Sequence, residues 1–170
     1  EAAHFIPSGR NVWEGRVERF DLMDPRCYRT LNDAKRLEKS LGTLGGGNHF
    51  IEIDSAPDGT KYLIIHSGSR NLGKQVAEYY QKLAVDLAMG KGELFEKRQE
   101  LIRTYKEQGR RKEIQPILRA MEKEWQPREL TMPADLCYLY GQYLEDYLHD
   151  VQICQQFAQR SREKMAEIIL

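Results

Sequence analysis

The chain has 170 residues, 41 % of them hydrophobic, and its 26 basic and 26 acidic residues give a formal net charge of zero. This length is enough to bury a core, and the neutral balance excludes a globally basic surface for nucleic acid or anionic membranes, so any anion site must be local. No apolar run approaches the ~18 residues of a membrane span and no signal-peptide pattern opens the chain, so we expect a cytoplasmic protein without a membrane partner.

The three cysteines, Cys27, Cys137 and Cys154, are odd in number and lack the close pairing of a zinc or redox motif. They are therefore expected to be reduced and mostly buried. The first residue is Glu and not Met, which suggests that the chain is cut from something longer.

The first part of the chain predicts an irregular start, a helix and a hairpin. Residues 1–26 alternate weakly and carry turn signals, at Pro7 and Gly9 among others, which predicts irregular structure or a short strand. Apolar positions near helical spacing predict a helix over 27–42, ended by Gly42. The segments 49–53 and 61–68 are rich in β-branched and aromatic residues and are separated by turn formers. They predict a β-hairpin with both strands largely buried.

The second part predicts helices. A helical pattern begins near residue 71 and stops at Gly90. The charged segment 91–128 predicts two amphipathic helices broken near Gly109. An extended connection over 131–140 leads to a long helix over 141–170. We expect one α+β domain over 1–170, with a small, mostly antiparallel sheet flanked by helices and with 91–128 protruding as a charged helical hairpin.

Two motifs carry the chemistry. In "LGTLGGGNHFIEI" the glycines at 45–47 allow positive φ and a close approach of the backbone to a ligand, and their N–H groups can cradle a phosphate. In "HSGSR", at the end of the second predicted strand, Ser67, Ser69 and Arg70 can hydrogen-bond an anion. The two motifs together predict a phosphate site beside the hairpin.

Each motif also contains a histidine. A hairpin symmetric about Pro57 and Asp58 would place His49 opposite His66, with Cα atoms about 4.5 to 5.5 Å apart. Two imidazoles so placed can ligate one metal ion or two adjacent ones. A slip of one residue would put them on opposite faces, and histidines packed in a core are the alternative.

These residues resemble a known family. "SLGTLGGGNHFIEI" and "HSGSRNLG" are similar to the two central signatures of the RtcB RNA ligases, and "LCYLYGQYLEDYLHDVQICQQFAQRSREKM" is similar to the segment after that family's helical insertion. The resemblance covers most of the chain and is weak before Asp33 and in the charged middle. It implies a partial RtcB-like fold, the cofactors Mn²⁺ and GTP, and RNA as the partner, in tRNA splicing or RNA repair.

The resemblance also implies roles for residues of this chain. His49 and His66 match histidine ligands of a two-manganese site. Asn48 matches the asparagine that contacts the guanylate phosphate. Phe50 and Glu52 match positions lining the guanine pocket, and Arg70 matches an arginine that holds an RNA or sulfate anion.

The chemistry implied by the family starts with a histidine that attacks the α-phosphorus of GTP; GMP then passes to an RNA 3′-phosphate, from which a 5′-hydroxyl displaces it. This chain departs from that pattern, because it has no "HGAGR" with the nucleophilic histidine and no segment supplying the bridging cysteine and aspartate. No catalytic residue is therefore assigned. We expect the central fragment of a ligase, inactive alone and with exposed apolar surface that favours self-association; a natural truncated relic is the second explanation.

Two other functions stay open. A non-catalytic module could bind RNA or a protein through the charged helices, where Arg110, Arg111 and Lys112 cluster. A hydrolase using two histidines and a metal-bound water would have only Glu52 as an evident general base.

Overall fold

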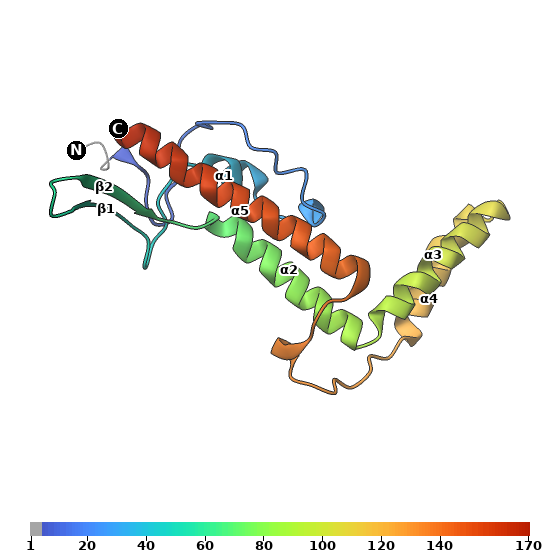
Figure 1. The fold of residues 1–170 in the computed structure, drawn as a ribbon. Coiled ribbons are helices and arrows are strands. Elements are labelled where there is room, and N and C mark those ends of the chain that lie inside the picture. The colour runs from blue at the N-terminus through green and yellow to red at the C-terminus, as the bar shows by residue number, and fades with distance from the viewer. Residues whose placement is uncertain (1–4) are drawn as a thin grey trace. The chain divides into compact units, whose positions relative to one another are not determined.

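The computed structural model describes residues 5–170 and shows an α+β fold (Figure 1). The chain divides into two compact units, the described part of Glu1–Tyr79 with Gly141–Leu170, and Tyr80–Tyr140. The elements in chain order are η2 (Tyr28–Thr30), α1 (Ala34–Lys39), β1 (Phe50–Ser55), β2 (Lys61–His66), α2 (Arg70–Ala88), α3 (Lys91–Glu107), η3 (Arg111–Glu113), α4 (Ile114–Glu124), η4 (Ala134–Leu136) and α5 (Gly141–Ile169).

The helix expected over 27–42 is only partly present. A 3₁₀ turn, η2, is followed by a break at Asp33, which has a left-handed φ of 51°. The Asp33 carboxylate accepts a hydrogen bond from the backbone N–H of Arg36 at 3.1 Å and caps α1. An aspartate that bonds the backbone in this way starts a new helix and does not continue an old one, which is why the predicted helix was too long. The first four residues of the segment expected to be irregular, 1–26, lie outside the described residues.

The hairpin forms as predicted, but its strands are not largely buried. β1 and β2 pair antiparallel, and most of their residues are exposed, including Ile53 at 64 % and Tyr62 at 55 %. Within the described residues the sheet has two strands, and α5 packs against β2. A two-stranded sheet leaves most of its apolar side chains in solvent unless further strands or helices cover it.

The core of the first unit joins α2 and α5 to the loop before the hairpin. Leu41, Leu72 and Phe157 are fully buried, and Phe20 meets Phe157 edge to face with ring centroids 5.1 Å apart. The prediction for the cysteines is confirmed: all three are free and buried. Burial, with Asp150 nearby, raises the pKa of Cys27 to about 12 and that of Cys154 to about 11.

The second unit contains the helical pair predicted for 91–128. α3 and α4 pack together over Leu94, Ile114 and Leu118, which are all buried. The chain turns between them at Gly109, which has a φ of 72°. Across the pair, Arg98 and Glu122 form an ion pair at 2.5 Å. None of the helices in the described residues has the length and apolar character needed to cross a membrane.

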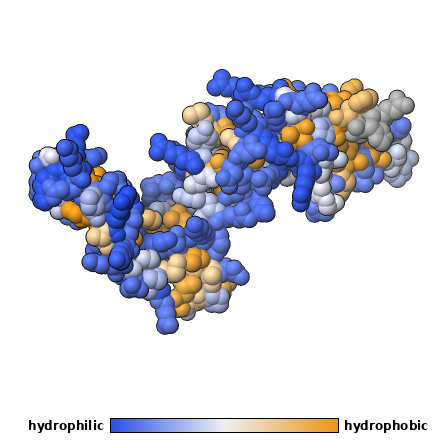
Figure 2. Space-filling view, turned by 180° about the vertical axis from the view of Figure 1, so that it is seen from behind, coloured by the Kyte–Doolittle hydropathy of each residue, from blue (hydrophilic) through white to orange (hydrophobic). Residues whose placement is uncertain are grey.

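Exposed apolar side chains are common in both units. In the first unit Figure 2 shows hydrophobic residues gathered at the end that carries the hairpin and the C-terminus. The exposed apolar side chains of the hairpin include Phe50, Ile53 and Ile64. In the second unit Leu136, Tyr138 and Tyr140 are at least 60 % exposed.

Candidate metal and phosphate site

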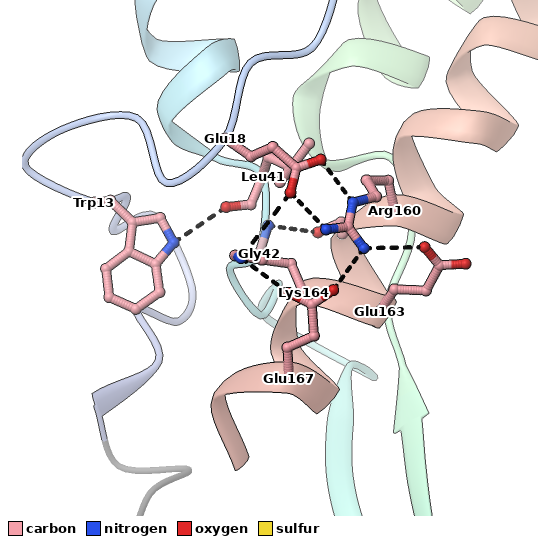
Figure 3. A network of polar contacts seen from close by, with 9 residues as sticks. Trp13, Glu18, Leu41, Gly42, Arg160, Glu163, Lys164 and Glu167 are labelled. Carbon is pink, nitrogen blue, oxygen red and sulfur yellow. Dashed lines mark hydrogen bonds and ion pairs between the residues drawn. The ribbon is translucent and has the colours of Figure 1, made fainter. Parts of the chain in front are cut away.

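The loop that carries the glycine motif is fastened to α5 before the glycines begin (Figure 3). Trp13 donates its indole N–H to the carbonyl of Leu41 at 3.1 Å, and the N–H of Gly42 donates to the Ser161 hydroxyl at 3.0 Å. Nearby, Arg160 of α5 forms two hydrogen bonds to the Glu18 carboxylate, at 2.6 and 2.5 Å. The bonds to Leu41 and Gly42 fix the start of the glycine segment, and the bonds between Arg160 and Glu18 join the N-terminal segment to α5.

Gly45 has no side chain because two other side chains fill its place. A Cβ atom at this position would lie 2.3 Å from Nδ1 of His49 and 2.7 Å from Nη1 of Arg70. Gly47 is needed for a different reason, since its φ of 70° is left-handed. The glycines therefore let an imidazole and a guanidinium approach the backbone from two motifs that are distant in sequence.

The ring of His49 is oriented by the glycine loop itself. Its Nδ1 lies 2.6 Å from the carbonyl oxygen of Gly46, so Nδ1 carries the proton and donates it. In the neutral ring Nε2 then keeps its lone pair, which is the arrangement usual for a metal-binding histidine.

The predicted register of the hairpin is wrong by one residue. His66 faces Phe50, not His49, and their rings stack with centroids 5.3 Å apart. β1 begins at Phe50, so His49 lies just before the ladder and is positioned by the loop. The symmetric turn that the prediction assumed does not form, because Ala56 and Thr60 close the turn with a backbone hydrogen bond of 2.8 Å. Even so, the rings of His49 and His66 come within 5.9 Å, centroid to centroid.

The hairpin presents three of the predicted site residues on one face. Because side chains alternate along a strand, Phe50 and Glu52 lie on the same face of β1, and His66 is paired across from Phe50. All three are exposed, as is Asn48 in the turn before His49. The residues implied for guanylate and metal binding are therefore neighbours on an open surface.

Arg70 begins α2 with a left-handed φ of 57°, which is uncommon for a large side chain. Its Nε donates to the buried hydroxyl of Thr43 at 3.0 Å, and its Nη2 donates to the carbonyl of Gly9 at 2.7 Å. Burial lowers the pKa of this guanidinium, and the charge of Arg36 lowers it further. Arg70 is thus held by neutral groups, with no carboxylate bonded to it in the described residues.

The two serines of the second motif lie in different surroundings. Ser67 is 7 % exposed, and its buried hydroxyl has no hydrogen-bond partner in the described residues. Its carbonyl accepts a hydrogen bond from Arg162 at 3.0 Å. The Ser69 hydroxyl lies over Gly73, where an added Cβ would meet it at 2.3 Å, and Ser69 lines a small cavity with Cys154. The Ser67 hydroxyl therefore has unused hydrogen-bonding capacity.

The donor set fits part of a metal site. His49 and His66 could supply two imidazoles, but no group of three or more His, Cys, Asp or Glu side chains in the described residues could hold a metal ion. Mn²⁺ prefers oxygen ligands and is low in the affinity order, so two imidazoles alone would bind it weakly.

The contacts that hold the site residues in place gave no signal in the sequence. Thr43 and Gly9 hold Arg70 from 27 and 61 residues away, and Arg162 holds Ser67 from 95 residues away. Only the glycine and serine motifs themselves, which are local, indicated that a site was present.

The basic cluster of the second unit is partly neutralised. Arg110 forms two hydrogen bonds to the Glu113 carboxylate, at 2.9 and 2.6 Å, and lies over the ring of Tyr105. The hydrogen bonds with Glu113 raise the pKa of Arg110. One of the three cations considered for an RNA-binding face is therefore already paired.

The glycine loop and the guanidinium held by neutral groups are features that can bind a phosphate group, and the two adjacent imidazoles are possible ligands of a metal ion. Comparison with known proteins identifies the family. The family model described as tRNA-splicing ligase RtcB matches residues 14–170. The chain belongs to the RtcB family.

Curated relatives agree with this result. The RNA-splicing ligase RtcB of Escherichia coli K12 is 32 % identical over 149 residues, which is 86 % of this chain and 26 % of that protein. The tRNA-splicing ligase RtcB of Aeropyrum pernix is 38 % identical over 60 residues, 27 % of this chain and 12 % of that protein. The chain thus spans about a quarter of the length of the E. coli relative. No solved structure matches the chain.

Proposed function

We propose that the chain supplies part of the manganese and guanylate site of a cytoplasmic, GTP-dependent RNA ligase. The parent enzyme would join RNA 3′-phosphate or 2′,3′-cyclic phosphate ends to 5′-hydroxyl ends. The observation that carries the proposal is the approach of His49 and His66 to 5.9 Å beside the glycine loop, with Arg70 next to His49. The names of the matched relatives support the same activity.

Each side chain would have a defined task. His49 would present Nε2 to a metal ion, since Nδ1 is bonded to Gly46. His66 would present its ring from the end of β2. A bound Mn²⁺ would neutralise charge on a phosphate and orient the attacking group. Asn48, Ser67, Ser69 and Arg70 would contact phosphate oxygens.

The hairpin would bind the base. Phe50 is 42 % exposed and offers a ring face, while the exposed carboxylate of Glu52 can accept hydrogen bonds from the edge of guanine. Both residues share the face of His66, so the base and the phosphates of one nucleotide could contact one surface.

We propose that this chain alone cannot join RNA. Its sequence has neither the histidine nucleophile motif nor the cysteine and aspartate ligands that the family resemblance implies. Incubation of the purified chain with GTP, Mn²⁺ and RNA carrying 2′,3′-cyclic phosphate and 5′-hydroxyl ends should give no joined product. A joined product would contradict the proposal.

Titration of Mn²⁺ followed by the free-ion EPR signal tests the metal site. The chain should take up Mn²⁺, and the double variant His49→Ala/His66→Ala should lose that uptake. His149→Ala is the matched control, because His149 lies on α5 and bonds Asp150 at 3.1 Å. Equal uptake by all three proteins would exclude a site built by His49 and His66.

We also propose that the exposed apolar residues of the hairpin favour self-association of the chain. Sedimentation velocity should show a larger species as the protein concentration rises. The variant Ile53→Lys/Ile64→Lys, which changes two exposed positions, should remain monomeric. A wild-type chain that stays monomeric at all concentrations would contradict this.

A further inference from the structure

A cavity of about 420 Å³ lies in the first unit beside Arg70. Residues 9–12, the loop before α1, the helix α1 and the start of α2 form its walls. Its lining includes one carboxylate, Asp33, and four cationic side chains, those of Arg10, Arg36, Arg70 and Lys74. In a chain with no net charge this is a strong local excess of positive charge.

The positive charges of this cavity are poorly neutralised. Asp33 uses its carboxylate to cap α1. The guanidinium of Arg36 donates to the carbonyl of Arg10, and that of Arg70 donates to Gly9 and Thr43, which are all neutral acceptors. Lys74 has an ion pair with Glu78 at 3.7 Å, but both side chains are at least 65 % exposed, where such a pair is weak.

The cations also repel one another. The charge of Arg36 adds to burial in lowering the pKa of Arg70. An anion between these side chains would remove that repulsion and accept charge-assisted hydrogen bonds, because guanidinium groups match phosphate oxygens well. The cavity therefore has the chemistry of a phosphate site.

The position of Arg70 connects this cavity to the histidines. Its Nη1 and Nδ1 of His49 both lie within 2.7 Å of the point where Gly45 would carry a Cβ. Arg70 therefore lies close to His49 and also lines the cavity. The residues assigned to guanylate, Asn48, Phe50 and Glu52, do not line the cavity, so nucleotide and cavity ligand would use separate contacts.

We propose that this cavity binds internal backbone phosphates of the single-stranded RNA whose end lies at His49 and His66. This inference rests on the proposed function, because that function supplies the RNA end. Arg10, Arg36 and Lys74 would hold the strand behind the end and fix its register at the site. These contacts would be independent of base sequence.

The test is the fluorescence anisotropy of a short labelled single-stranded RNA, titrated with the full chain at several salt concentrations. The variant Arg10→Gln/Lys74→Gln changes two side chains that have no part in the core, and the Arg10 carbonyl that accepts from Arg36 remains. Arg19→Gln/Lys61→Gln is the matched control, with the same loss of charge in the first unit outside the cavity.

The cavity variant should bind the RNA about tenfold more weakly, and the salt slope of log K should fall by about 0.7 for each phosphate that the variant no longer neutralises. The control should keep both the affinity and the slope. The decrease should be the same for RNA ending in a 3′-phosphate and in a 3′-hydroxyl, because internal phosphates are common to both.

Four results would overturn the assignment. They are no RNA binding by the wild-type chain, unchanged RNA binding by the cavity variant, an equal decrease in the control, and a decrease confined to the 3′-phosphate RNA, which would place the end of the strand in the cavity. Mn²⁺ uptake separates this inference from the proposed function. A cavity variant with intact Mn²⁺ uptake and unchanged RNA binding refutes the cavity alone. The cavity proposal predicts no change in Mn²⁺ uptake, so a loss of that uptake would bear on the site formed by His49 and His66.

Discussion

The two units of the chain differ in how some of their charged groups are bound. The first unit contains ion pairs, such as Arg160 with Glu18, but it also has charged groups bound by neutral polar atoms: Arg70 donates to Thr43 and Gly9, and the carboxylate of Asp150, 0 % exposed, accepts from two backbone N–H groups. In the second unit charges meet opposite charges at the surface, as in the pair of Arg98 and Glu122. Charges bound to neutral partners can still act on a ligand, whereas surface ion pairs mainly keep a helical pair soluble.

The largest expected effect comes from the core of the first unit. Phe157→Ala removes a fully buried ring and should cost about 3–5 kcal/mol of stability. Hydrogen exchange should show lower protection in α2 and α5, and α3 and α4 should keep theirs. The partially exposed Phe95 of the second unit provides the control Phe95→Ala. Equally reduced protection in α3 and α4 would mean that the two units do not unfold separately.

The buried carboxylate should give the next largest effect. Burial is the strongest single influence on Asp150 and would raise its pKa, but hydrogen bonds from the backbone of Arg26 and Cys27 and from His149 outweigh it, so the pKa is lowered. Stability from this group is therefore present above its unfolded pKa, about 3.9, and is lost as the pH falls through the lower folded value.

Asp150→Asn should cost about 1.5–3 kcal/mol at neutral pH, because one carboxylate oxygen that accepts a backbone N–H is replaced by an NH₂ group that cannot accept, and the other bond becomes a neutral one. It should also remove part of the acid sensitivity. Urea unfolding at neutral pH and at several pH values around and below the ordinary carboxyl pKa of about 3.9 measures both effects. The exposed Asp54→Asn is the control. A variant as acid-sensitive as the wild type would show that Asp150 does not link folding to pH.

Gly45→Ala tests the close approach of the two motifs. The added methyl group would overlap His49 and Arg70, so we expect a loss of about 1–3 kcal/mol in stability together with loss of Mn²⁺ uptake. Urea unfolding and the EPR titration measure these. Gly15→Ala, where nothing lies within 4 Å, should change neither. Normal Mn²⁺ uptake by Gly45→Ala would mean that the positions of His49 and Arg70 are not needed.

The smallest effect is expected for a surface ion pair of the second unit. Arg98→Gln breaks the pair with Glu122 and should cost only about 0.2–1 kcal/mol, less in high salt. Thermal unfolding at low and high salt is the measurement, and Arg103→Gln, an exposed cation of the same helix, is the control. A salt-independent decrease above that range would show that this pair is not a simple surface interaction.

The sequence predicted the helices α2 to α5, the hairpin and the position of the two motifs, because periodicity and turn residues are local signals. The prediction was wrong for features that depend on contacts between segments far apart in the chain. The register depends on how the turn closes at Ala56 and Thr60, and the exposure of the strands depends on what covers them. Thr43 became a partner of Arg70 only through folding. Tertiary interactions of this kind leave no pattern in a single sequence.

The anchoring of the glycine loop has a practical consequence for mapping experiments. Gly42 is bonded to Ser161, and Glu18 to Arg160, although neither residue of α5 belongs to the predicted ligand set. A shortened chain that ends before Arg160 would keep every predicted ligand and still lose the support of the loop. Deletion mapping would then assign the binding site to the last helix, so point substitutions are the safer way to locate it.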